Sequence, residues 1–433
     1  MNRKLPYRKL LLPNGLTVFL VNIKTVKTFY VSLYVKVGTV NEDRKNNGIS
    51  HFLEHFIHQG TKNYKSFELL SEAIEFEGMY QNAQSGRFST VYYVDSPSEK
   101  GEKALDFLYE LVFLPTLPAS RLNHVKKIVL SEYFGYWSEP QNKFKQKMFL
   151  RRMRGENVYQ YDSLGRPETI QSFTREKLLA WKNKYYQPAN MILSVAGNFN
   201  QRKIMMKIKN SFGKKKNTEK IEEPSRLKIT YSDFLTYYQK EKSNQIRFLL
   251  TFPTFGFKEV KMRKLLWLGL LSFIVGDSPS SRLAKLLREN NNLVYSVGSD
   301  TVDFPFMGEF IIGGSVAKEN LSLSMQLIKK ELEKIKKNGV QKKETQKAKN
   351  LYRRNIVCFN FETPLQIADW VVGEELAGRK IRLPEEYMRI VEKISKEEID
   401  CLVQEIFDFS KINIGLMGNL KKDEIEKAIS VFK

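Results

Sequence analysis

Cysteine is scarce in this 433-residue chain, which contains only Cys358 and Cys401. Two cysteines cannot build a disulfide framework, and such low usage suits a reducing compartment. We also expect no secretory signal in the first residues, because Pro6, Pro13 and Asn14-Gly15 interrupt the apolar stretch and no small-residue cleavage site follows. These absences predict a cytoplasmic protein.

Long hydrophobic runs are missing as well. Runs such as residues 265–275 fall short of the roughly 20 apolar residues that a membrane-spanning helix needs, so we expect no membrane partner. Acidic residues are fewer than basic ones, and the formal charge of +23 is compatible with an anionic partner. However, Lys-rich segments such as 327–350 carry interspersed Glu, which is typical of solvated helix faces. Nucleic-acid binding is therefore the less favoured alternative.

What the chain does contain is enough apolar material for more than one core, with 42% hydrophobic residues. In residues 8–21, Asn14-Gly15 lies between two β-rich runs, which predicts a hairpin. Further strands are predicted at 28–38 and 89–97, and helices around 46–59 and 66–77. This mixture indicates an α+β fold.

An internal repeat divides the chain into two similar halves. Residues 174–204 and 395–425 share one plan: a hydroxyl N-cap, a helix, a turn, an apolar strand and a Gly-Asn ending. Thr174 and Gly197 are 23 residues apart, as are Ser395 and Gly418, so the offset is 221. We expect each half to be a mainly antiparallel sheet packed with helices. The predicted parts are an N-terminal domain (1–212), a linker (213–226) and a C-terminal domain (227–433).

Histidine occurs four times, always in the first half, and three of the four lie within residues 48–60. His51 and His55 are four residues apart, so on a helix both imidazoles can reach one ion, as zinc ligands do. Glu54 borders the same face and can activate water, which makes His-x-x-Glu-His the inverted form of a zinc peptidase motif. The alternative is an amphipathic helix with histidines at its border.

A water-accessible zinc site needs a third protein ligand. The candidates are His58, His124 and downstream carboxylates, and spacing alone does not choose between Glu132 and Glu139.

The second half lacks the motif. The offset of 221 sets residues 269–276 against 48–55, and the three chemically active positions then become Ser272, Val275 and Gly276. The second half is therefore expected to keep the helix and to lose the ligands.

Residues 48–64 and 77–93 resemble the N-terminal half of the pitrilysin (insulinase) family of zinc metallopeptidases. In that family the third ligand is a glutamate about 77 residues after the second histidine, a position that Glu132 holds in "IVLSE". The resemblance thus implies one Zn²⁺ per chain, held by His51, His55 and Glu132. It also implies that Glu54 is the general base.

The resemblance extends to substrate contacts. Residues 280–299 are similar to a family segment whose arginine and tyrosine reach the active site, which implies that Arg288 and Tyr295 hold the substrate backbone and stabilise the oxyanion. Before them, "SSR" at 280–282 is interpreted as a helix start. "YQNAQSG" (80–86) resembles the family's edge segment, where a substrate adds a strand, so Asn82 and Ala83 are expected beside the scissile bond.

Two positions depart from the family pattern. Val125 stands where many relatives have a second, supporting acid, and its neighbour His124 either compensates or is simply exposed; we favour exposure. His58 stands where relatives often have an apolar residue, and an ordinary polar border is the favoured interpretation.

The sequence therefore predicts a zinc-dependent endopeptidase that hydrolyses peptides or unfolded segments with metal-activated water. The resemblance implies two halves facing each other as a clamshell around a chamber. It also implies a homodimer, or a heterodimer with a related subunit. A catalytically inactive scaffold or partner subunit of the same fold is the alternative function.

Overall fold

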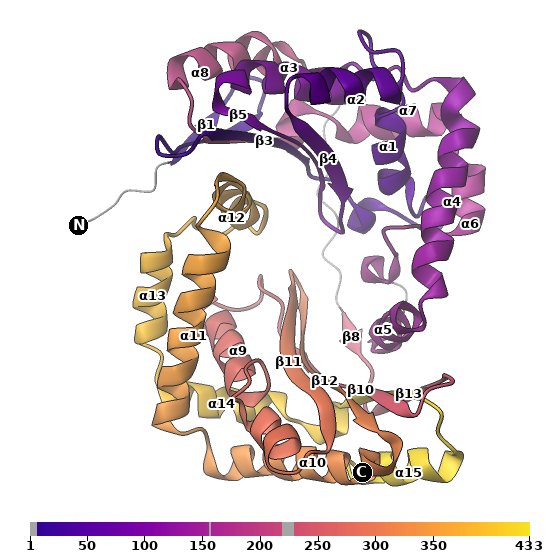
Figure 1. Ribbon diagram of the computed structural model, residues 1–433, viewed down its shortest axis with the longest axis vertical. Helices are drawn as coiled ribbons and strands as arrows, with labels where there is room; N and C mark the ends of the chain where they lie inside the picture. Colours follow the sequence, from indigo (N-terminus) through magenta and orange to yellow (C-terminus); the bar gives the residue numbers. More distant parts are fainter. Residues whose placement is uncertain (1–6, 156, 219–228) are drawn as a thin grey trace. The chain divides into compact units, whose positions relative to one another are not determined.

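The computed structural model describes residues 7–155, 157–218 and 229–433 (Figure 1). The chain forms two compact units: unit 1 comprises residues 1–137, 157–226 and 360–381, and unit 2 comprises 138–156, 227–359 and 382–433. Most of the predicted linker, residues 219–226, lies outside the described residues. Among the described residues, no helix is long and apolar enough to cross a lipid bilayer.

Unit 1 contains a six-stranded sheet with the order β1-β2-β7-β3-β5-β4. Its strands are β1 (Tyr7–Leu11), β2 (Thr17–Asn22), β3 (Thr28–Val35), β4 (Tyr80–Ser85), β5 (Thr90–Pro97) and β7 (Met191–Gly197). The β2–β7 pair is parallel and the other pairs are antiparallel. The predicted hairpin is confirmed, since Leu11 pairs with Thr17 across a turn in which Gly15 has φ 83°.

Helices cover one face of this sheet. They are α1 (Ile49–Ile57), α2 (Phe67–Phe76), α3 (Gly101–Phe113), α4 (Leu122–Ser138), α6 (Pro167–Ser172), α7 (Arg175–Tyr185) and α8 (Gln201–Asn210). The main core joins their apolar faces to alternate residues of the strands, for example Phe52 of α1, Leu108 of α3 and Val31 of β3. This packing holds α1 between the sheet and α4, which positions the histidine motif.

The opposite face of the unit 1 sheet is covered by α12 (Pro364–Leu376), a helix from the second half of the sequence (Figure 1). Ile367 and Val371 of α12 pack in one buried cluster with Phe19, Tyr30 and Ile192 of the strands. Asp369 also accepts a 2.6 Å hydrogen bond from the Tyr34 hydroxyl. The units therefore differ from the predicted domains, because 360–381 joins unit 1.

Unit 2 contains a five-stranded sheet with the order β11-β12-β10-β13-β9. The strands are β9 (Leu235–Lys240), β10 (Gln245–Thr254), β11 (Val294–Phe304), β12 (Met307–Ala317) and β13 (Asn413–Gly418), and β13–β9 is the parallel pair. Its helical segments are α9 (Met262–Val275), η7 (Ala284–Glu289), α10 (Leu321–Asn338), α11 (Lys342–Asn360), α13 (Pro384–Glu392), α14 (Lys396–Ile406) and α15 (Lys422–Ser430). The mixed sheets with packed helices confirm the predicted α+β class.

One segment of the first half belongs to unit 2. It contains α5 (Pro140–Arg151) and β6 (Met153–Arg154), which pairs with β8 (Thr230–Tyr231). Arg152 at the end of α5 forms a buried ion pair with Glu309 of β12. This segment of the first half of the sequence thus lies in unit 2.

The predicted repeat is visible in corresponding elements of the two units. Thr174 caps α7 by accepting from the Lys177 N–H, and Ser395 caps α14 by accepting from the Glu398 N–H. The strands that follow, β7 and β13, each pair in parallel with one neighbour and antiparallel with another. Residues 269–275 lie in α9, so the second half keeps a helix at the place of the histidine motif.

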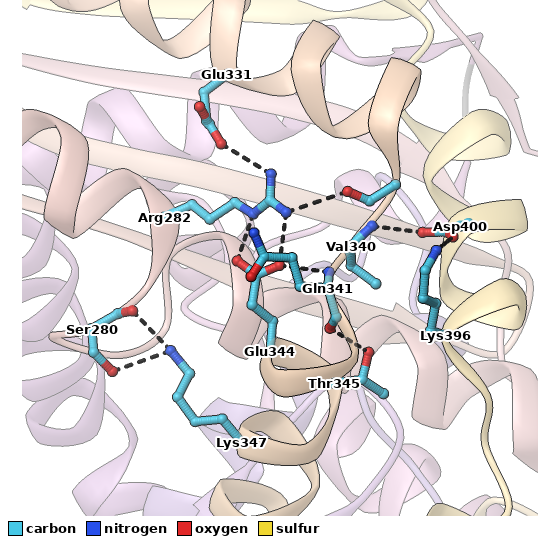
Figure 2. A network of polar contacts seen from close by, with 11 residues as sticks. Ser280, Arg282, Glu331, Val340, Gln341, Glu344, Thr345, Lys347, Lys396 and Asp400 are labelled. Carbon is cyan, nitrogen blue, oxygen red and sulfur yellow. Dashed lines mark hydrogen bonds and ion pairs between the residues drawn. The ribbon is translucent and has the colours of Figure 1, made fainter.

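Arg282 connects three segments of unit 2 (Figure 2). Its guanidinium donates two 2.7 Å hydrogen bonds to the Glu344 carboxylate and one of 3.1 Å to Glu331. A further bond of 3.3 Å reaches the Gly339 carbonyl. Arg282 is therefore more than the helix-start residue that was expected, whereas Ser281 does accept a bond from the Ala284 N–H.

Candidate metal centre

The helix α1 presents the two histidines of the motif on one side and an apolar face on the other. Phe52 and Phe56 are fully buried in the unit 1 core. His51 and His55, one turn apart, have ring centroids 4.7 Å apart and nearly perpendicular planes. Because the buried face fixes the rotation of the helix, both imidazoles are directed toward α4.

Glu42 caps the N-terminus of α1. Gly48, the residue before the helix, supplies no side-chain cap, and the Glu42 carboxylate instead accepts the N–H groups of Gly48 at 2.7 Å and Ser50 at 3.0 Å. Asn47 Nδ2 donates a third bond. Burial raises the pKa of Glu42 and these hydrogen bonds oppose the rise. Sequence analysis missed this residue, although an acid shortly before a glycine-led helix is a usable signal.

Glu132 of α4 completes a group of three possible metal ligands. His51 Nε2 lies 3.1 Å from His55 Nε2, and Glu132 Oε2 lies 3.6 Å from His51 Nε2 and 3.3 Å from His55 Nε2. Ligand atoms held tetrahedrally by zinc lie about 3.3–3.6 Å apart, given bond lengths of about 2.0–2.2 Å. The two distances to Glu132 have this spacing and the distance between the histidines is about 0.2 Å shorter, so the three side chains fit a zinc ion after a small separation of the imidazoles. Among the described residues, no other three His, Cys, Asp or Glu side chains converge in this way.

The charges of this group suit a cation. Burial, and then the neighbouring His55, lower the pKa of His51 to about 4, so its imidazole is neutral. Burial lowers the pKa of His55, but the hydrogen bond to Glu132 and the nearby carboxylates outweigh this effect, so the pKa is raised. The hydrogen bond from His55 lowers the pKa of Glu132. These two shifts are those of a hydrogen-bonded pair, and a cation bound at the same atoms would compete with a proton on His55.

Glu54 lies beside this group on α1 and is 8% exposed. Burial raises the pKa of Glu54, while His55 and hydrogen bonds from Ser85 of β4 lower it. A buried carboxyl group with a raised pKa can both accept and return a proton. The buried hydroxyls of Tyr92 and Tyr186, 2.8 Å apart, lie within electrostatic range of it.

The other candidate ligands lie outside the group. His124 is exposed on α4, as favoured, and its neighbour Val125 is buried in the core. Glu139 precedes α5 and belongs to unit 2. The expectation of a polar border is wrong for His58, which is buried: Nδ1 lies 2.8 Å from the Glu54 carbonyl oxygen and Nε2 lies 3.1 Å from Gln81 Oε1.

The predicted substrate segment forms β4, the strand at the edge of the unit 1 sheet. Asn82 pairs with Tyr93 and Ala83 with Tyr92 of β5, and among the described residues no strand pairs with the other side of β4. Because Ser85 of the same strand hydrogen bonds Glu54, the edge adjoins the candidate base. Asn82 is exposed, and its Oδ1 accepts the Ala83 N–H at 2.8 Å.

Arg288 and Tyr295 lie in unit 2. The Arg288 side chain is exposed and pairs with the adjacent Glu289 at 2.7 Å. Tyr295 is 80% exposed and lies at an irregularity in the β11–β12 pairing, between Val294 and Ser296. Their approach to the histidine group stays a prediction.

Comparison with known proteins places this geometry in a family. Residues 17–167 match the model "Insulinase (Peptidase family M16)", and residues 172–352 match "Peptidase M16 inactive domain". A protein of Rickettsia felis named as an uncharacterized zinc protease is 30% identical over 92% of this chain and 94% of its own. The chain belongs to peptidase family M16.

Other M16 relatives share the same extent. The mitochondrial-processing peptidase subunit beta of Saccharomyces cerevisiae is 26% identical over 94% of this chain and 90% of its own. A protease of Helicobacter pylori has the same fold, with a TM-score of 0.84, 22% identity and coverage of 96% of this chain and all of that one. The first half of the chain, with its histidine group, is thus the half that matches the M16 peptidase model.

Proposed function

We propose that this protein is a zinc-dependent endopeptidase that hydrolyses peptides or unfolded segments. The observation that carries the proposal is the group of His51, His55 and Glu132, whose ligand atoms lie 3.1–3.6 Å apart, close to the spacing of zinc ligands. The names of relatives as zinc proteases support it. These three side chains would hold one Zn²⁺ per chain, which when bound would supply a Lewis acid for water and the peptide carbonyl.

Glu54 is the general base of the proposed reaction. Its carboxylate accepts the proton of the attacking water and then returns that proton to the leaving amine. Its burial supports both roles, since a raised pKa brings the protonated and ionised forms closer in energy.

The substrate is held by an edge strand. An extended peptide adds to β4, where Asn82 and Ala83 lie next to the scissile bond, and backbone hydrogen bonds make binding tolerant of sequence. Arg288 and Tyr295 of unit 2 hold the substrate backbone and stabilise the oxyanion. Their exposure leaves both side chains available for a ligand.

The proposed assembly is a homodimer or a heterodimer with a related subunit. The name of the yeast relative, a subunit beta, is compatible with this. We also propose a cytoplasmic location, because Cys358 and Cys401 are both exposed and free of disulfides.

Zinc analysis and one substitution test the proposal together. The purified chain should contain about one zinc ion, and Glu54→Gln should retain it while losing cleavage of a mixed peptide library by at least about a hundredfold. Glu132→Gln should lose zinc, whereas Glu139→Gln, a matched change outside the group, should behave as the parent.

Three results would contradict the proposal. Far less than one zinc per chain without cleavage would favour the inactive scaffold. Cleavage by Glu54→Gln at the parental rate would exclude Glu54 as the base. Salt-sensitive nucleic-acid retention without peptidase activity would favour the nucleic-acid alternative.

A further inference from the structure

The sheet of unit 2 has a hollow on the face that bears α5. Alternate residues of β10 divide between the two faces: Phe252 contacts Phe407 at the end of α14, whereas Leu249 packs in one cluster with Phe144 of α5 and Met417. A pocket of about 460 Å³ lies on the α5 face, between that helix and strands β10, β11 and β12. Every residue that lines it belongs to unit 2.

Glycine creates the space. Leu249 of β10 pairs with Gly313 of β12 on one side and Gly415 of β13 on the other, so the row across the sheet has a single large side chain. A Cβ at Gly415 would meet Phe144 and Met148, so α5 fills that end of the row. At Gly313 a Cβ would meet only the Leu249 side chain, at 2.9 Å, and the Phe248 carbonyl, so this end stays open as the pocket floor.

The pocket is lined by positively charged side chains and by no acidic ones. Lys145 of α5 and Arg247 of β10 both line it, and no Asp or Glu does. Within the described part of the chain, neither side chain has an ion pair or hydrogen bond to another residue. Arg247 pairs across the sheet with Ser315, whose hydroxyl lies 3.3 Å from that of Ser296. A planar guanidinium beside hydroxyl donors suits a carboxylate.

Apolar surface adjoins these cations. Phe144 and Leu249 form one side of the pocket, and the exposed ring of Tyr295 lies at its border. A matching ligand therefore combines a carboxylate with a neighbouring apolar side chain. A phosphate would find the cations but would leave the apolar side uncovered, so a peptide fits better.

We propose that this pocket is a peptide-binding subsite that selects substrates with a carboxylate next to an apolar side chain. The carboxylate is either that of an Asp or Glu side chain or the C-terminus of the peptide. This inference rests on the proposed peptidase function and names its substrate class. Arg247 is the specificity-determining residue, and Lys145 adds attraction at the rim.

Binding measured without cleavage tests the proposal. The full-length, zinc-loaded Glu54→Gln protein is titrated into three fluorescent peptides that share an Ala/Ser sequence. The first ends in Phe-Glu with an amidated C-terminus, so its carboxylate is a side chain. The second ends in amidated Phe-Gln and has neither carboxylate, and the third ends in Phe-Gln with a free C-terminal carboxylate. The Glu54→Gln protein should prefer at least one carboxylate peptide by about tenfold, a ratio that corresponds to about 1.4 kcal/mol and that a charged hydrogen bond can supply. The preferred peptide identifies the source of the carboxylate.

Three variants locate the preference. Added to Glu54→Gln, the change Arg247→Gln should reduce the ratio of affinities for carboxylate and amide peptides to near one. Lys147→Gln, which removes one positive charge outside the pocket lining, should leave this ratio unchanged. Gly313→Val should weaken every Phe-containing peptide, because the new side chain fills the floor.

The possible outcomes separate the two proposals. A Glu54→Gln protein without preference, an added Arg247→Gln change that keeps the preference, or an equal loss with the added Lys147→Gln change would overturn the subsite. Failure of the chain with Glu54 intact to cleave any peptide would overturn the peptidase function, yet the binding preference of the Glu54→Gln protein would still be measurable.

Discussion

At the scale of single residues, His58 and His124 show that packing around a side chain, and not its flanking sequence, determines whether it is buried. His58 is buried and bridges the Glu54 carbonyl and Gln81, whereas His124 is exposed on α4. Nothing in their flanking sequence ranks one above the other as a structural residue. The sequence pattern indicates which residues share a helix face, but burial depends on the strand that packs against it.

We therefore expect His58→Ala to lower the free energy of unfolding by about 2 kcal/mol. The change leaves the Gln81 amide and the Glu54 carbonyl oxygen without their buried partner. His124→Ala should change it by less than about 0.5 kcal/mol. Urea unfolding of both metal-free variants provides the measurement, and equal values would contradict the structural role of His58.

Zinc affinity should depend on pH through His55. Zinc binding requires the neutral imidazole, and the pKa of His55 is raised by Glu132 and Glu54, so a proton competes with the metal as the pH falls below that pKa. His51 adds no competition until about pH 4. Zinc affinity should thus fall about tenfold per pH unit in the mildly acidic range, as for one displaced proton.

Competition with a zinc chelator over that pH range measures this slope. A flat profile would show that no ligand proton is displaced. A slope near two protons in the same range would show that His51 is also protonated there.

At the scale of elements, α1 depends on a cap that lies outside the helix. Glu42→Gln replaces one of the two oxygens that accept three N–H groups with an amide NH2 that cannot accept, and we expect a loss of about 1–3 kcal/mol in the free energy of unfolding. Zinc affinity should fall with it, because the same helix carries two ligands. Glu72→Gln on the exposed side of α2 is the matched control. Identical unfolding curves for the two variants would exclude the cap.

The segment 138–156 is held in unit 2 by the Arg152–Glu309 ion pair, whose side chains are 6% and 1% exposed. Arg152→Met leaves a buried carboxylate alone, and we expect it to cost about 3–5 kcal/mol. The double change Arg152→Met with Glu309→Leu should recover most of this loss, because no unpaired charge remains. Denaturant unfolding of the single and double variants checks this; a double variant no better than the single one would contradict it.

Local elements were the part of the fold that the sequence predicted well. The hairpin at Gly15, the caps Thr174 and Ser395, and the helix of His51 each depend on residues near in the chain, where turn chemistry and periodicity act directly. The family resemblance was needed to choose Glu132 over Glu139, because the spacing of residues along α4 does not show which of them faces α1. The cap by Glu42 was missed because it acts across a loop.

At the scale of the whole molecule, the two halves of the sequence exchange elements. Strands β2 and β3 have apolar residues on both faces, which already requires a cover for each face of the sheet. The sequence did not reveal that α12, more than 300 residues downstream of these strands, supplies the second cover. The spacing of apolar residues along a helix shows which face is buried, but it does not show which sheet that face contacts.

This exchange predicts that neither half is stable alone. A fragment of residues 1–226 lacks α12 and exposes Phe19, Tyr30 and Ile192, while a fragment of residues 227–433 lacks α5. Each should aggregate when expressed separately, and co-expression should restore a soluble complex that binds zinc, because each fragment supplies the cover that the other lacks. Size-exclusion chromatography with zinc analysis measures this.

Ile367→Asp with Val371→Asp in the second fragment should abolish rescue, whereas Leu365→Asp, a change at an exposed position of the same helix, should not. A stable, zinc-binding 1–226 fragment would show that the covering helix is dispensable.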